Sequence, residues 1–218
     1  MSEIRDRTKR HFPMVLLTLL SIVQALALEL LWSHVLSTDY LFEQSLTALN
    51  AWIQLVATFL GLVLIWVVYA SNAMRFRWVP VTSDSVYPFL IGVLQFMLVE
   101  TLGPGETGQW LVILAVIYAV MVRVSHTTMK RARRDPDNDA FFRDLPRATM
   151  RDFYSSAAIA GGLGLAGVYL IGAPDDGVIE TLALVSAGGI LAWQFYESTR
   201  YWKMSVGTAA DNAQAEQQ

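Results

Sequence analysis

The stretch from Ala48 to Ser71, "ALNAWIQLVATFLGLVLIWVVYAS", runs for 24 residues without a charged side chain. The hydrocarbon core of a bilayer is about 30 Å thick, and a helix needs roughly 20 apolar residues to cross it. The run also lacks the alternation of apolar and polar residues that is typical of a membrane barrel strand. We therefore expect this stretch to form a membrane-spanning helix.

Similar runs recur along the chain, which has a mean hydropathy of +0.40 and only 16% charged residues. A soluble domain has about a quarter of its residues charged. Only helices and closed barrels satisfy the backbone in lipid. The sequence therefore predicts an all-α integral membrane protein whose six transmembrane helices occupy residues 14–36, 48–71, 85–102, 108–124, 155–173 and 178–199. We expect one transmembrane domain over residues 13–204, a cytoplasmic arm over 1–12 and a polar, disordered cytoplasmic tail over 205–218.

The basic residues indicate how this domain is oriented. All 16 Lys and Arg residues fall before the first span, between spans two and three, at or between spans four and five, or after the sixth. These positions share one side of a six-span chain, and basic residues stay in the cytoplasm. We therefore expect both termini to be cytoplasmic. The first run is longer than a signal peptide, so we expect it to be retained. Short connections favour a prokaryotic inner membrane, that is, a plasma membrane location.

The charged connection over residues 125–152, "SHTTMKRARRDPDNDAFFRDLPRATMRD", has three interpretations. Its basic residues hold the connection on the cytoplasmic side, and topology alone accounts for them. Alternatively, aromatic rings that alternate with arginines suit an interfacial segment that meets lipid headgroups. The third interpretation is a docking site for a cytoplasmic protein. The second and third depend on Phe141, Phe142, Arg143, Arg147 and Arg151.

Several kinds of site find no support in the sequence. The chain has no cysteine, which excludes disulfides and thiolate metal sites. Its three histidines, His11, His34 and His126, are isolated. No nucleophile and base occur at a recognisable spacing. We expect no metal, no cofactor, no nucleic-acid partner and no enzymatic activity.

The run over residues 155–173 is rich in small side chains. Its "GLGLAG" matches the glycine pattern of a dinucleotide-binding turn, but no strand precedes it. Small residues four apart let a neighbouring helix approach closely. We therefore expect this helix to be central, either within the protomer or at a subunit interface. The predicted packing residues are Ala157, Ala160, Gly161, Gly162, Gly164 and Ala166.

Polar residues inside the spans are candidates for a pathway, because charges in lipid are costly. Glu29 lies about 6 Å from the middle of the first span on the outer side, and no basic residue shares its depth. It belongs to a narrow polar or small stripe that comprises Thr18, Ser21, Ala25, Glu29 and Trp32. Gln54, Thr58 and Gln95 are possible lining groups. The alternative for such residues is a seam of interhelical hydrogen bonds.

The predicted outer side carries acids and no bases. Its loops and outer half-spans contain Asp39, Glu43, Glu100, Glu106, Asp175, Asp176 and Glu180 in addition to Glu29. A negative mouth of this kind concentrates cations. The alternative is that outer loops need polar residues and basic ones are disfavoured there.

Two functions follow as hypotheses. The first is a homo-oligomeric, channel-like membrane protein that provides a cation or proton pathway, with Glu29 as its titratable residue. The alternative is a non-conducting scaffold or sensor subunit that docks a cytoplasmic partner through residues 125–152. The two differ in whether function depends on Glu29 or on the arginines of that connection.

Overall fold

The computed structural model describes residues 2–143, 149–173 and 176–215 of the chain. Within these ranges there are helices, turns and bends but no strand. The long helices are α1 (Ser2–Ser37), α2 (Leu46–Arg75), α3 (Thr82–Glu100), α4 (Thr107–Ala132), α6 (Tyr154–Gly172) and α7 (Gly177–Ala215). The short ones are α5 (Asp139–Phe142) and the 3-10 helices η1 (Asp39–Phe42), η2 (Pro136–Asn138) and η3 (Met150–Phe153).

Six helices in these ranges are long and apolar enough to cross a membrane. The predicted all-helical class with six such helices is therefore confirmed. The helices extend beyond some predicted spans: α1 begins within the arm, and α7 continues through residues 205–215, where we expected disorder. Hydropathy marks only the apolar part of a helix. Arg, Lys, Ala, Gln and Glu also favour helix, so polar turns can extend an apolar one.

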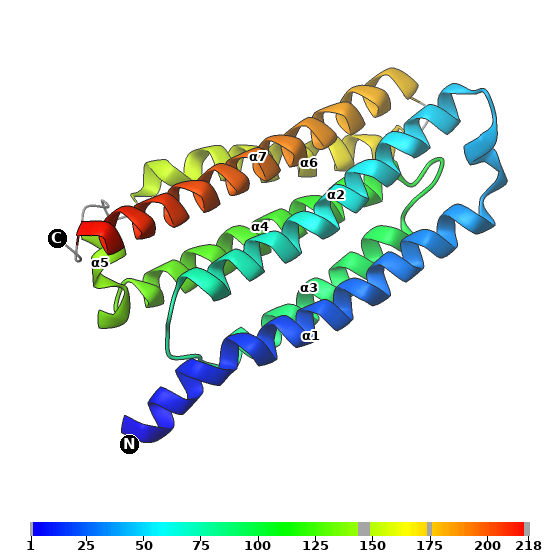
Figure 1. Cartoon of the computed structure of the whole chain (residues 1–218). Coiled ribbons are helices and arrows are strands. Elements are labelled where there is room, and N and C mark those ends of the chain that lie inside the picture. Colours follow the sequence, from blue (N-terminus) through cyan, green and yellow to red (C-terminus); the bar gives the residue numbers. More distant parts are fainter. Residues whose placement is uncertain (1, 144–148, 174–175, 216–218) are drawn as a thin grey trace.

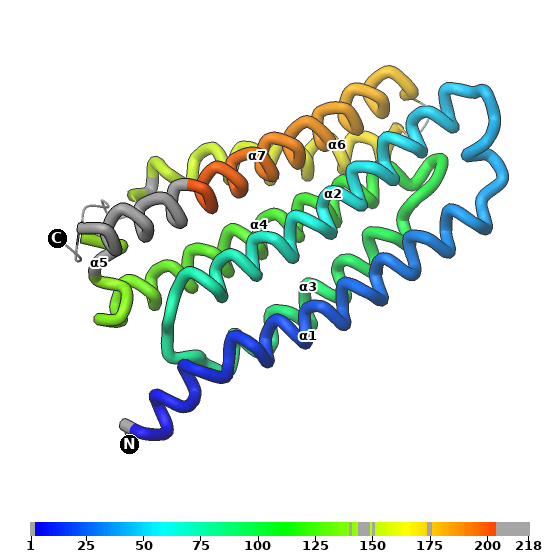
Figure 2. Tube along the Cα trace, viewed as in Figure 1, coloured from blue at the N-terminus to red at the C-terminus, as the bar shows by residue number. Residues whose placement is uncertain are grey.

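The six long helices lie in two rows of three (Figure 1). One row contains α1, α2 and α7, and the other contains α3, α4 and α6. Across the rows α1 packs on α3 and α6 packs on α7, so that α2 and α4 occupy the middle. Each long helix runs opposite to the long helix before it along the chain (Figure 2). This places both termini, the α2–α3 connection and α5 at one end of the bundle, called here the terminal end.

The core lies around the two middle helices. Its fully buried side chains include Leu62 on α2, Ile91 and Leu98 on α3, and Trp110 and Leu111 on α4. On α2 the buried Leu62, Ile65 and Tyr69 are three and four positions apart and so lie on one stripe of the helix. The opposite end of the bundle, called here the far end, contains the turn between α3 and α4. In this turn Gly103 adopts a φ of 138° that other residues rarely take.

The structure contradicts a central place for the helix at residues 155–173 within the protomer. This helix, α6, lies at the end of its row. Only 17% of its most apolar segment is buried, against 44% for the corresponding segment of α2. Ala157, Gly161 and Gly162 are exposed, and nothing lies within 4 Å of a Cβ added at either glycine. Gly164 does face α4, because a Cβ added at this position would lie 3.8 Å from the Ala115 Cβ. Small residues permit close packing without requiring it. Their possible role at a subunit interface stays a prediction.

A close approach between α4 and α6 involves a different pair of glycines, Gly108 and Gly167. A Cβ on Gly108 would lie 2.7 Å from the backbone nitrogen of Ile171. A Cβ on Gly167 would lie 2.7 Å from the carbonyl oxygen of Gly108 and 2.9 Å from the nitrogen of Val112. These atoms are backbone and cannot rotate away. The two helices can therefore touch only because both positions lack a side chain.

We expect Gly167→Ala to lower the free energy of unfolding by about 1–3 kcal/mol, the usual cost of overpacking. The measurement is SDS-induced unfolding in mixed micelles, followed by circular dichroism. Gly162→Ala is the matched control on the same helix, because its added methyl group meets open space. Equal stability of the two variants would contradict the assigned α4–α6 contact.

Candidate functional site

The polar stripe on α1 faces outward from the bundle. The opposite face of α1 carries the buried Leu20, Ala27 and Leu31. Glu29 is exposed and lies eight residues before the end of α1 at Ser37, which is about 12 Å along the helix axis. No basic side chain forms an ion pair with it in the part of the chain that the structure describes. The other four stripe residues, Thr18, Ser21, Ala25 and Trp32, are exposed as well.

Gln54 and Thr58 are buried inside the bundle, and both form hydrogen bonds with neighbouring residues. The Gln54 Nε2 donates to the carbonyl oxygen of Thr101 at 3.3 Å, and its Oε1 accepts from the backbone nitrogen of Gly103 at 3.2 Å. Thr58 Oγ1 donates to the Gln54 carbonyl at 2.8 Å and accepts from Trp110 Nε1 at 2.9 Å. These bonds tie α2 to α4 and to the α3–α4 turn. Both residues therefore act as structural hydrogen-bonding groups.

Gln95 is fully buried on α3, and neither of its amide atoms has a hydrogen-bond partner among the described residues. Gln24 on α1 is also buried, and its Nε2 has no partner. The two helices touch near this level, because a Cβ on Gly92 would lie 2.7 Å from the Val23 Cγ1. Gln95 thus belongs to the interior, whereas Glu29 is on the surface. The structure does not bring Glu29 together with Gln54, Thr58 or Gln95 within one protomer.

Of the acids predicted to form the outer mouth, some are hydrogen-bonded to other parts of the bundle and others are exposed. Glu180 accepts from Asn50 Nδ2 at 3.3 Å and from Thr107 Oγ1 at 2.7 Å, which joins α7 to α2 and α4. Asp176 accepts from the Ile179 backbone nitrogen at 3.2 Å and so caps the start of α7. Asp175 lies outside the described residues. The exposed acids at the far end are Asp39, Glu43, Glu100 and Glu106.

The aromatic residues of the charged connection turn inward. The Phe142 ring is buried and stacks on Phe76 from the α2–α3 connection, with centroids 5.5 Å apart. Phe141 contacts the Phe76 ring edge to face, with centroids 5.0 Å apart. The Arg133 guanidinium lies 4.8 Å from the Phe142 centroid. The structure therefore contradicts the use of Phe142 as an exposed lipid or partner contact, because another part of the chain already covers it. Arg143 and Arg151 are exposed, and Arg147 lies outside the described residues.

Hydrogen bonds and an ion pair fasten the start of this connection to the rest of the terminal end. Lys9 on α1 pairs with the buried Asp135 at 2.6 Å. Asn138 accepts from the Arg77 nitrogen at 3.1 Å and donates to the Arg77 carbonyl at 2.6 Å and the Ala132 carbonyl at 2.8 Å. The connection is thus held by α1, by the α2–α3 connection and by the end of α4.

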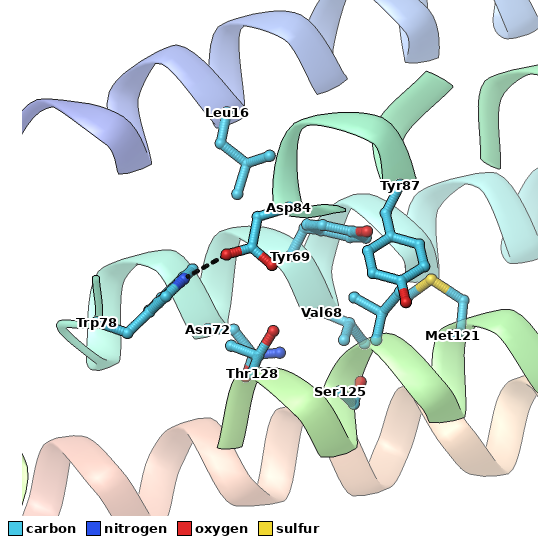
Figure 3. A pocket seen from close by; sticks show the side chains of 11 residues that line it. Leu16, Val68, Tyr69, Asn72, Trp78, Asp84, Tyr87, Met121, Ser125 and Thr128 are labelled. Carbon is cyan, nitrogen blue, oxygen red and sulfur yellow. Dashed lines mark hydrogen bonds between the residues drawn. The ribbon is translucent and has the colours of Figure 1, made fainter. Parts of the chain in front are cut away.

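Sequence reasoning missed the buried Asp84 at the start of α3 (Figure 3). Its Oδ2 accepts from Trp78 Nε1 at 3.2 Å and from the Val81 nitrogen at 3.1 Å. Its Oδ1 pairs with the Arg131 guanidinium from the end of α4. An acid in the first turn of a helix is a recognisable local signal. The pairing with Arg131 is not, because 47 positions separate the two residues.

The described residues contain no group of three or more His, Asp or Glu side chains that could hold a metal ion. At the far end, burial raises the pKa of the Tyr40 hydroxyl, which therefore stays protonated over the physiological range. The carboxylate that stands apart is Glu29. It lies on an outward face of a long apolar helix, where no described residue of the same copy forms an ion pair with it. Comparisons with protein-family models, with curated proteins and with solved structures found no match to this chain.

Proposed function

We propose that the protein is a homo-oligomeric membrane protein that provides a cation or proton pathway, with Glu29 facing that pathway between subunits. The observation that carries this proposal is the exposure of Glu29 on the polar face of α1. A carboxylate inside a membrane span normally faces a protein interior or a water-filled cavity. In a single copy it faces neither. A second copy packed against α1 would supply the missing cover.

The residues around Glu29 suit contact with another helix. Ala25 lies one turn and Ser21 two turns before Glu29 on the same exposed face. Small and hydroxyl side chains let helices approach closely in lipid and offer hydrogen bonds between them. Trp66 on α2 donates to Ser21 Oγ at 3.4 Å at the border of this face. The α1 face therefore combines a titratable group with the surface that an intersubunit contact needs.

The exposed acids favour cations over anions. Asp39 and Glu43 follow α1 directly, and Glu100 ends α3, the helix that packs beside α1. Negative side chains around an opening raise the local concentration of cations. Several copies around an axis would multiply this effect. We propose that the protein lies in a prokaryotic inner membrane with the far end outside and the basic terminal end in the cytoplasm.

The proposal assigns structural roles to the interior polar residues. Gln54 and Thr58 take part in hydrogen bonds that join α2 to α4 and to the α3–α4 turn. Between Thr58 and Tyr69 the buried side chains of α2 include Leu62 and Ile65, which are apolar. A polar path through the middle of one protomer would have to pass them. This supports a pathway between protomers.

The first test uses wild-type protein in liposomes loaded with a pH-sensitive or a cation-sensitive dye. A potassium gradient with valinomycin sets the membrane potential, and flux above that of protein-free liposomes is expected. The alternative function, a scaffold or sensor that binds a cytoplasmic protein through residues 125–152, retains its exposed Arg143 and Arg151. That alternative predicts no flux. Flux equal to that of empty liposomes would therefore reject the pathway.

The intersubunit contact is tested by single-cysteine cross-linking, since the chain has no cysteine of its own. We expect Ala25→Cys to form covalent dimers in native membranes on mild oxidation, because α1 faces would meet across a subunit contact. Leu165→Cys on α6 is the control, with its side chain 74% exposed on a different face. Cross-linking through position 165 and not through position 25 would move the interface away from α1 and contradict the proposal.

A further inference from the structure

A small cavity lies near the terminal end where α1, α2, α3 and α4 meet (Figure 3). Its volume is about 20 Å³. The lining includes Leu16 from α1, Tyr69 from α2, Asp84 from α3, and Ser125 and Thr128 from α4. A cavity needs about 10–15 Å³ of space open to the centre of a water-sized sphere to hold one water molecule. The cavity is therefore large enough for one water molecule.

One wall of this cavity presents a hydroxyl group without a partner. The Tyr69 side chain is 7% exposed, and its Oη has no hydrogen bond within the described structure. Buried polar groups are almost always paired with protein or with ordered water. A group left unpaired costs about 1–3 kcal/mol. The Tyr69 hydroxyl therefore favours a hydrogen-bonding occupant in the cavity.

Charge limits what the occupant can be. Asp84 is the acid that lines the cavity, and its carboxylate is already paired with Arg131. An additional cation would find a carboxylate whose charge is balanced. A neutral molecule that both donates and accepts hydrogen bonds fits better. Thr128, Ser125 and Asn72 add further polar atoms to the lining, and a buried water molecule makes 2–4 hydrogen bonds in general.

We propose that this cavity binds one ordered water molecule, which bonds to the Tyr69 hydroxyl and to the Asp84 carboxylate. The water would complete a polar cluster that joins α2, α3 and α4 beside the Asp84–Arg131 pair. Asn72 and Ser125 are half-buried, so the rim of the cavity reaches the surface of the bundle and allows exchange with solvent. The inference stands independently of the proposed pathway, because it concerns the interior of one protomer.

The test is hydroxyl-radical footprinting of the full-length protein by brief X-ray exposure in water labelled with ¹⁸O, read by mass spectrometry. Radiolysis of a bound water oxidises the side chains beside it even when these are buried. We expect Tyr69 to be labelled several-fold faster than Trp110, which is also buried, at 0% exposed against 7% for Tyr69, and whose ring nitrogen is paired with Thr58 away from this cavity. Labelling of Tyr69 as slow as that of Trp110 would overturn the proposal.

A high-resolution structure of the wild-type protein and of Tyr69→Phe gives a second readout. In the wild type we expect a density peak within hydrogen-bond distance of Tyr69 Oη and an Asp84 oxygen. In Tyr69→Phe that peak is expected to weaken or vanish, since the variant removes one of its partners. An empty cavity in the wild type, or a direct Tyr69–Asp84 hydrogen bond in its place, would refute the water site. So would a peak with the short contact distances of a bound metal cation.

Discussion

Glu29→Gln is expected to reduce cation or proton flux through the reconstituted protein to that of protein-free liposomes. Glutamine has nearly the same shape as glutamate but can neither release a proton nor balance a cation. A group whose charge drives passage should therefore lose its function while the protein keeps its fold. The measurement is the initial rate of dye response at equal protein density in the liposomes. Flux in Glu29→Gln equal to that of the wild type would remove Glu29 from the pathway.

The controls for this variant separate the position from the charge. Glu43→Gln removes one negative charge from another exposed carboxylate, at the far end of the bundle. We expect it to retain most of the flux, because an exposed charge at an opening acts through a field that salt screens. Glu29→Asp keeps the titratable group and should retain part of the flux. Cross-linking through Ala25→Cys combined with Glu29→Gln shows whether the subunits still assemble.

Arg131→Met is expected to lower the free energy of unfolding by about 3 kcal/mol, the lower end of the usual loss for a buried ion pair, because Arg131 itself is 26% exposed. Asp84 is 7% exposed, and the substitution leaves its carboxylate without a positive partner in the described structure. Its hydrogen bonds from Trp78 and Val81 remain, so the carboxylate keeps partners but loses charge compensation. SDS-induced unfolding in mixed micelles measures the change.

Lys130→Met is the matched control for Arg131→Met. It removes one positive charge from the neighbouring position of α4, where the side chain is exposed. We expect a change within about 0.5 kcal/mol, as for other exposed sites. The double variant Asp84→Asn with Arg131→Met should recover part of the loss, because no uncompensated charge remains. If Arg131→Met and Lys130→Met cost the same, Asp84 and Arg131 are not coupled.

Much of the fold follows from local features of the sequence. The apolar runs of about 20 residues predict six helices because the backbone in lipid must satisfy its own hydrogen bonds. Alternating helix direction then sends both termini to one end, as the structure has them. The lengths of α1 and α7 were less predictable, since polar residues with good helix propensity extend a helix without changing its apolar centre.

The candidate site could be predicted only in part. Composition and periodicity identified the polar stripe on α1 and Glu29 within it, because residues that share a helix face recur at a regular spacing. Periodicity cannot show whether such a face points toward the core or away from it. That depends on which helices become neighbours, and in this bundle α2 and α3 cover the other face of α1.

By itself, the sequence determined the helical class, the six apolar helices and the position of a carboxylate inside one of them, because hydropathy and helical periodicity are local properties. The tertiary structure decided which polar groups are buried and paired. Gln54 and Thr58 form hydrogen bonds inside the bundle, and Phe142 packs on Phe76. Asp84 pairs with Arg131, which is 47 positions away in the sequence. It also left Glu29 on the outside. Contacts of this kind arise from packing between distant segments, and no local pattern encodes them.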